Sequence, residues 1–158
     1  MAGEARNSFA GRVVAVTPGD HQSLLEVETP GGHRLVAVLA NEQLRAMVVD
    51  DDPEIVSYLV TLLQDNGYET CSASDGDKAM EVLTRECPDC ITLDLEMPHE
   101  WGPRFYRKYS QKEEFKDIPV VVISGLSGHD MAIRRAVAAI HKPFEPEAVL
   151  AAVKKACD

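Results

Sequence analysis

Residues 45–53 read RAMVVDDDP, a short apolar run that ends in three consecutive aspartates before a proline. The apolar run predicts a buried strand, because runs of this length rich in β-branched residues suit a pleated sheet. Pro53 indicates the first turn of a helix, where a residue without an N–H loses no helical hydrogen bond. The segment therefore predicts a strand that passes directly into a helix, with carboxylates at the junction.

The same alternation of strand and helix continues to the end of the chain. Apolar runs predict strands at 45–49, 68–72, 90–93, 120–124 and 139–141, and helical periods predict helices at 53–66, 75–85, 104–109, 130–138 and 146–156. Strands that alternate with helices are typical of a parallel sheet covered on both faces. We expect residues 44–158 to be an α/β domain with a doubly wound, parallel, five-stranded sheet.

Residues 1–43 have a different pattern. Three β-rich runs, at 12–17, 23–28 and 34–39, are separated by turns that contain Pro and Gly. They predict a small antiparallel β meander, which needs an apolar face packed on something to be stable. This second, smaller domain is expected to pack on residues 44–158 or on a second copy of itself, which would give a homodimer.

Composition excludes several classes of function. The chain has 158 residues and a net charge of −10, which disfavours binding to DNA or anionic lipid through phosphate neutralisation. The run Ile118–Ile123 is far shorter than the roughly 20 apolar residues that cross a bilayer, and residues 1–10 lack the apolar stretch of a secretory signal. We expect a cytoplasmic protein whose partners are proteins or small ligands.

Polar side chains follow the predicted strands at one edge of the sheet. Asp50 and Asp51 follow the first strand, Asp94 follows the third, Ser124 ends the fourth and Lys142 follows the fifth. Ligands of open parallel sheets collect at the carboxyl ends of the strands. Adjacent carboxylates repel one another unless a cation is bound, and hard oxygen ligands suit Mg²⁺.

Carboxylate, hydroxyl and ammonium groups around Mg²⁺ are the parts that phosphoryl transfer requires. Asp94 is the expected nucleophile, because it lies at the centre of the sheet and an ionised carboxylate needs no general base. Its product would be an aspartyl phosphate.

At these residues the sequence resembles the receiver domains of two-component response regulators, which have a flavodoxin-like fold. The matching stretches are Val48–Pro53, Pro88–Asp94, Met97-Pro98 with Gly102, Ile118–Gly125 and Lys142-Pro143-Phe144. The resemblance implies a phosphoacceptor that receives phosphate from a sensor histidine kinase or a phosphotransfer protein. It would then signal through contact with a downstream protein, without enzyme activity beyond its own phosphorylation and dephosphorylation. The net charge of −10 separately leads us to expect no DNA binding.

The resemblance also implies a role for each residue of the site. Asp94 would be the phosphoacceptor, Ser124 the hydroxyl that follows the phosphoryl group and Lys142 its counter-ion. The implied metal ligands are Asp51 directly, Asp50 largely through water, the phosphoacceptor Asp94 and the backbone carbonyl of Glu96. The lifetime of the phosphorylated state would depend on Glu96 and Leu126, of which Leu126 is expected to obstruct water.

The receiver pattern is altered between Ser124 and Lys142. This span is a few residues shorter than is usual in the family, and Ala139 stands where an aromatic residue commonly reports phosphorylation. We therefore expect the readout of phosphorylation to differ from that of the family.

The amino-terminal segment has a resemblance of its own. Residues 5–19 and 34–38 resemble the first part of the Mop or TOBE modules, which bind molybdate and related oxyanions. The match stops before the strands that would close the small barrel. It implies assembly more strongly than oxyanion binding.

Other interpretations of these residues stay open. A phosphatase of the haloacid dehalogenase type also uses a strand-end Asp with a Ser and a Lys, and a third alternative is an oxyanion-binding or assembly module whose receiver-like domain is inactive. Asp50 and Asp51 could instead cap the helix that starts at Pro53. The aromatic residues after Pro98 could form a partner-binding patch or simply cover the sheet.

Overall fold

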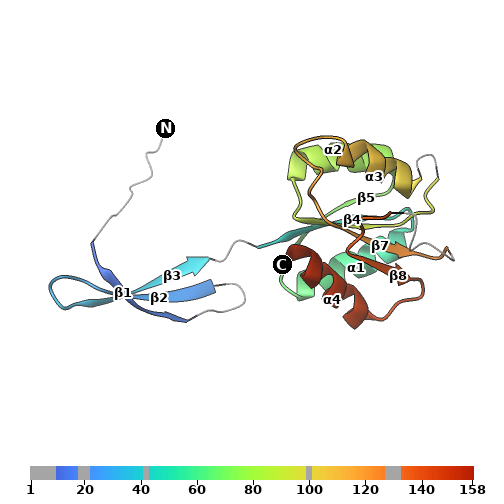
Figure 1. Cartoon of the computed structure of the whole chain (residues 1–158). Helices are drawn as coiled ribbons and strands as arrows, with labels where there is room; N and C mark the ends of the chain where they lie inside the picture. The colour runs from blue at the N-terminus through green and yellow to red at the C-terminus, as the bar shows by residue number, and fades with distance from the viewer. Residues whose placement is uncertain (1–9, 18–21, 41–42, 99–100, 127–132) are drawn as a thin grey trace, which may run out of the picture. The chain divides into compact units, whose positions relative to one another are not determined.

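The computed structural model describes residues 10–17, 22–40, 43–98, 101–126 and 133–158. The chain forms two compact units, which divide between Gln43 and Leu44; they carry the element labels of Figure 1. Within the described residues, no helix is long and apolar enough to cross a bilayer.

The amino-terminal unit is an antiparallel three-stranded sheet in the order β1-β2-β3, with strands Arg12–Thr17, Gln22–Glu28 and Arg34–Ala40. The β2–β3 turn contains Gly32, whose φ of +77° is open to glycine at no steric cost. This sheet confirms the predicted meander. Large apolar side chains remain exposed on it: Val13, Val16, Leu24, Leu35, Val36 and Val38.

The carboxy-terminal unit is built on a parallel five-stranded sheet in the order β5-β4-β6-β7-β8. The strands are β4 (Arg45–Val49), β5 (Glu69–Ala73), β6 (Cys90–Leu93), β7 (Val120–Ser124) and β8 (Ala138–His141). The described residues form four helices that cover it: α1 (Pro53–Asp65), α2 (Gly76–Glu86), α3 (Gly102–Ser110) and α4 (Pro146–Cys157). The α/β fold class is therefore confirmed.

The helices lie on both faces of this sheet, with α2 and α3 on one side and α1 and α4 on the other (Figure 1). Alternate side chains of one strand serve both faces: Met47 and Val49 pack in the cluster beneath α2 and α3, whereas Ala46 and Val48 pack in the cluster beneath α1 and α4. This alternation follows from the two-residue period of a strand. The central strands β6 and β7 are mostly apolar because both of their faces are buried.

The helix expected at 130–138 is wrong for the part that the structure describes. Residues 133–135 form a turn, and Ala138 already belongs to β8. The Val137 N–H donates to the Val120 carbonyl at 2.8 Å, so this backbone is committed to pairing with β7. Residues 127–132 of the prediction lie outside the described residues.

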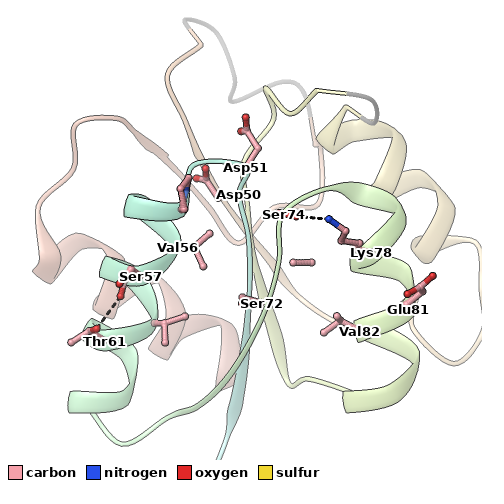
Figure 2. Close-up of a pocket in the computed structure, with 13 residues that line it drawn as sticks. Asp50, Asp51, Val56, Ser57, Thr61, Ser72, Ser74, Lys78, Glu81 and Val82 are labelled. Carbon is pink, nitrogen blue, oxygen red and sulfur yellow. Dashed lines mark hydrogen bonds between the residues drawn. The ribbon is translucent and has the colours of Figure 1, made fainter.

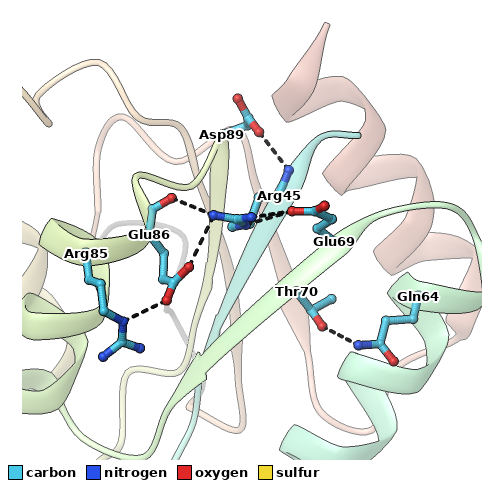
Figure 3. Close-up of polar contacts among 7 residues, drawn as sticks. All are labelled: Arg45, Gln64, Glu69, Thr70, Arg85, Glu86 and Asp89. Carbon is cyan, nitrogen blue, oxygen red and sulfur yellow. Dashed lines mark hydrogen bonds and ion pairs between the residues drawn. The ribbon is translucent and has the colours of Figure 1, made fainter. Parts of the chain in front are cut away.

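Arg45 links the amino ends of neighbouring strands, at the edge of the sheet opposite the predicted site (Figure 3). The Arg45 guanidinium on β4 pairs with Glu69 of β5 and contacts Glu86 at the end of α2, through its carboxylate at 3.2 Å and its carbonyl at 3.1 Å. The Arg45 N–H donates to Asp89 at 2.7 Å. Because these contacts join segments far apart in sequence, the local patterns did not predict them.

Candidate functional site

The sheet brings four predicted site residues to one edge. Backbone hydrogen bonds continue the strand pairing beyond the strands themselves: Asp50 N–H donates to the Ala73 carbonyl at 3.2 Å, Asp94 N–H to Val49 at 2.9 Å, and Lys142 N–H to Ser124 at 3.0 Å. The positions of these side chains are therefore set by the register of the sheet. Asp50, Asp94 and Ser124 are all buried.

Three carboxylates gather at this edge. Asp50, Asp51 and Asp94 each offer an oxygen, and these atoms all lie within 4.8 Å of one another. Asp50 and Asp94 are only 2% and 5% exposed, whereas Asp51 is exposed to solvent. Buried carboxylates at such distances destabilise one another unless positive charge is supplied.

Lys142 supplies part of that charge. Its ammonium lies 2.7 Å from Asp50 Oδ2 and 3.3 Å from Asp94 Oδ2. Burial lowers the pKa of Lys142, but the hydrogen bond and charge of Asp50, followed by those of Asp94, outweigh burial and leave the pKa raised. Lys142 is therefore held in its charged form between the two buried aspartates.

Lys142 offsets only part of the cost of burying the charge of Asp50. Burial is the largest influence on its carboxyl group and raises its pKa, against the hydrogen bonds from Lys142 and from the Asp52 N–H, which lower it. Three carboxylates face one ammonium in this cluster, so excess negative charge remains. A divalent cation would remove that excess.

The helix start at Pro53 is capped by the third aspartate of the run. Asp52 Oδ1 accepts from the backbone N–H groups of Glu54 at 2.9 Å and Ile55 at 3.4 Å, as an N-cap residue does. Capping was the open alternative for Asp50 and Asp51, and Asp52 takes this role instead. The two preceding aspartates are thereby left to face the strand edge.

An orphaned buried atom lies in the same cluster. Asp94 Oδ1 is buried and has no hydrogen-bond partner among the described residues, an arrangement that costs free energy unless the atom binds something. The three carboxylates fit a hard divalent cation such as Mg²⁺ in charge and donor type. Asp50, Asp51 and Asp94 are the side chains that would hold it.

The segment after β7 is connected to this cluster through Ser124. The Ser124 hydroxyl oxygen accepts from the Leu126 N–H at 3.2 Å, and Leu126 is half-buried against the core. A Cβ placed on Gly125 would lie 3.5 Å from Glu96 Oε2, so the exposed Glu96 side chain reaches the same loop. The metal role expected for the Glu96 carbonyl stays a prediction.

The start of α3 is pressed against the backbone of Asp94, a feature that sequence reasoning missed. Gly102 N–H donates to the Leu95 carbonyl at 3.1 Å. A Cβ on Gly102 would lie 2.2 Å from the Asp94 carbonyl oxygen and 2.9 Å from Leu95 Cα. Only glycine permits this approach, and the Gly102 in the receiver-like pattern was the one available signal for it.

A groove of about 620 Å³ extends from the acidic cluster between α1 and α2. Figure 2 shows Asp50 and Asp51 at one end, with Val56, Ser57 and Thr61 on α1 facing Lys78, Glu81 and Val82 on α2. Lys78 and Ser74 both line the groove. The Lys78 ammonium donates to the Ser74 hydroxyl oxygen at 3.1 Å. The acidic cluster is therefore accessible along this groove through Asp51.

Two family models match the chain. The response regulator receiver domain matches residues 46–154, and the TOBE domain matches residues 3–51. The two matches overlap at β4 and together correspond to the two units of the structure.

Individual proteins agree with the first of these matches. Protein Rrf1 of Nitratidesulfovibrio vulgaris is 38% identical over 112 residues, which cover 71% of this chain and 81% of Rrf1. The sensor histidine kinase TmoS of Ectopseudomonas mendocina is 29% identical over 119 residues, which cover 75% of this chain but only 12% of TmoS. Among solved structures, chemotaxis response regulator CheY4 of Vibrio cholerae matches with a TM-score of 0.67 and 25% identity, over 72% of this chain and 98% of CheY4.

Proposed function

The chain belongs to the response regulator receiver domain family, and we propose that it is a phosphoacceptor of a two-component phosphorelay, phosphorylated on Asp94 with Mg²⁺ as cofactor. The phosphodonor would be a sensor histidine kinase or a phosphotransfer protein, and the output would be contact with a downstream protein. One observation carries the proposal: the buried, partnerless Asp94 Oδ1 lies in a cluster of carboxylates next to Lys142.

In the reaction, an Asp94 carboxylate oxygen attacks the phosphorus of a phosphohistidine. An O–P bond forms, the N–P bond breaks, and the imidazole leaves with the bonding electron pair. The transition state spreads negative charge over the phosphoryl oxygens, so a group that neutralises this charge accelerates transfer. Lys142 is positioned to do so from 3.3 Å beside Asp94, and bound Mg²⁺ would supply the remaining neutralisation.

Ser124 is proposed to couple phosphorylation of Asp94 to a movement of the backbone after β7. Its hydroxyl oxygen accepts from the Leu126 N–H at 3.2 Å, and its hydroxyl proton can be donated to a phosphoryl oxygen. Phosphorylation of Asp94 would draw this hydroxyl toward the new anion and displace the loop that follows β7. The loop displacement would be the conformational signal.

Residues 1–43 are proposed as an assembly domain. Six large apolar side chains of its sheet are exposed, Val38 and Val36 by 56% and 64%, and exposed apolar faces of this kind favour association with another surface. A second copy of the sheet would cover them. Association through this sheet is independent of phosphorylation.

The phosphoacceptor proposal is tested by incubating the protein with Mg²⁺ and acetyl phosphate and measuring its intact mass. We expect the mass to increase by one phosphoryl group in the native chain, and no increase in Asp94→Asn. Asp117→Asn is the matched control, because Asp117 is exposed and precedes β7, at the opposite end of the strand. Labelling of Asp94→Asn at the native level would mean that the nucleophile is elsewhere, and steady turnover of a generic phosphomonoester would favour the phosphatase alternative.

A further inference from the structure

A groove of about 810 Å³ lies between α3 and the turn at residues 133–135. This turn occupies the place in the chain where a helix was expected. Four arginines and two aromatic residues give the groove its character: Arg104, Arg107, Arg134, Arg135, Trp101 and Tyr106. None of the described residues that line it is acidic.

The positive charge of this groove is exceptional for the chain. The protein carries a net charge of −10, yet four of its nine arginines line the groove, and all four are exposed. Within the described part of the chain, Arg107, Arg134 and Arg135 form no ion pair. The groove therefore offers guanidinium groups to carboxylates from another molecule, which they bind with bidentate geometry.

The aromatic residues make the groove suitable for a protein partner. Trp101 is 55% exposed, and Tyr106 is half-buried and packs edge-on against the buried Tyr109, with ring centroids 5.3 Å apart. Tyr106 is thus held by the core while part of it stays accessible. Trp, Tyr and Arg are the residues that contribute most binding energy at protein interfaces.

The groove is connected to the acidic cluster through α3. The α3 wall starts at Gly102, which contacts the Asp94 backbone directly. The opposite wall, which includes the buried Ile133, follows Ser124, whose hydroxyl is bonded to the Leu126 N–H. A displacement of the Asp94 backbone would therefore shift the α3 wall of the groove.

We propose that this groove binds an acidic segment with apolar anchors from a downstream partner protein. Arginines would pair with its Asp and Glu residues, and an apolar side chain would pack against Trp101 and Tyr106. That this contact transmits the phosphorylation signal rests on the proposed function. The binding itself is a property of the groove in the unphosphorylated chain as well.

Trp101 is the single tryptophan of the chain, so its fluorescence reports directly on the groove. The probe is a synthetic amphipathic peptide with Asp and Glu on one face and Leu and Phe on the other, titrated into the full-length protein. A peptide with Asn and Gln in place of the acids is the ligand control. We expect saturable change in Trp101 emission with the acidic peptide, weakened by salt, and binding at least about tenfold weaker with the neutral peptide.

The matched variants reverse two positive charges at different places. Arg134→Glu with Arg135→Glu should weaken binding of the acidic peptide by about tenfold or more, because attraction becomes repulsion. Lys154→Glu with Lys155→Glu makes the same change in net charge on exposed residues of α4 and should change the dissociation constant less than about twofold. Equal weakening in both variants, or no saturable response in the native chain, would overturn the proposal, as would stronger binding of a single-stranded oligonucleotide.

Phosphorylation is measured separately by intact mass in the groove variant. Arg134→Glu with Arg135→Glu should accept phosphate on Asp94 like the native chain, because neither arginine belongs to the acidic cluster. Normal phosphorylation without peptide binding in the native chain would refute only the groove. Peptide binding without phosphorylation would refute only the phosphoacceptor proposal.

Discussion

Replacing Gly102 with alanine should disrupt the contact between α3 and the phosphoacceptor strand. The added Cβ would lie 2.2 Å from the Asp94 carbonyl oxygen, 2.9 Å from Leu95 Cα and 3.1 Å from the Asp94 carbonyl carbon. All three neighbours are backbone atoms at the end of β6, so no side chain can rotate away. The helix must therefore shift, and with it the α3 residues Phe105 and Tyr109, whose side chains are fully buried.

The free energy of unfolding should fall by about 2 kcal/mol. Overpacking of a well-packed core typically costs about 1–3 kcal/mol, and the higher helix propensity of alanine returns less than about 1 kcal/mol at a helix start. For a domain of residues 44–158 the loss corresponds to a decrease in Tm of about 8 °C. Displacement of the Asp94 backbone should also slow phosphorylation by acetyl phosphate.

The assay is urea unfolding followed by circular dichroism, with Gly125→Ala as the matched control. Among the described residues, a Cβ on Gly125 would meet only the flexible Glu96 side chain, at an ordinary contact distance of 3.5 Å. This control should therefore stay within about 0.5 kcal/mol of the native chain. Native stability for Gly102→Ala, or an equal loss in both variants, would refute the packing argument.

Three further predictions follow from the site and the amino-terminal sheet. Asp51→Ala should weaken Mg²⁺ binding by about tenfold or more, because a carboxylate ligand is lost, whereas Glu54→Ala should not; calorimetry measures both, and unchanged affinity would remove Asp51 from the metal site. Leu126→Ala should speed the decay of the phosphorylated protein after donor removal by exposing the acyl phosphate to water, while Ser124→Ala should still be phosphorylated; a decay in the leucine variant as slow as in the native chain contradicts the shielding. Deletion of residues 1–43 should convert a self-associating protein into a monomer in sedimentation, and a monomer before deletion would mean that the sheet packs within its own chain.

The strand ends of the carboxy-terminal unit could be predicted from sequence because parallel topology carries distant residues to a common edge. Asp50, Asp94 and Lys142 were each expected there, and the structure places their charged atoms in contact. Local periodicity is a strong signal for strands that are buried on both faces. Once the strands are assigned, the residues at their carboxyl ends can be predicted to lie close together.

Features that depend on tertiary contacts could not be predicted in this way. The expected helix at 130–138 had a helical period, but the pairing of Val137 with Val120 decided the conformation of its later part. From sequence, the aromatic residues after Pro98 could either cover the sheet or form a partner-binding patch. In the structure Phe105 and Tyr109 are buried, whereas Trp101 is exposed. The groove with four arginines lies between α3 and the turn at 133–135. These segments are separated in the sequence, so no local pattern could predict that they lie close together.

The most direct test of the account is to locate the phosphoryl group after reaction with acetyl phosphate and Mg²⁺. The native chain is digested under conditions that preserve acyl phosphates, and the fragments are identified by mass. We predict one added phosphoryl group, only on the fragment that contains Asp94, and only when Mg²⁺ is present. Phosphate on another fragment, or equal labelling without Mg²⁺, would contradict the assignment of Asp94 in its acidic cluster as the phosphoacceptor.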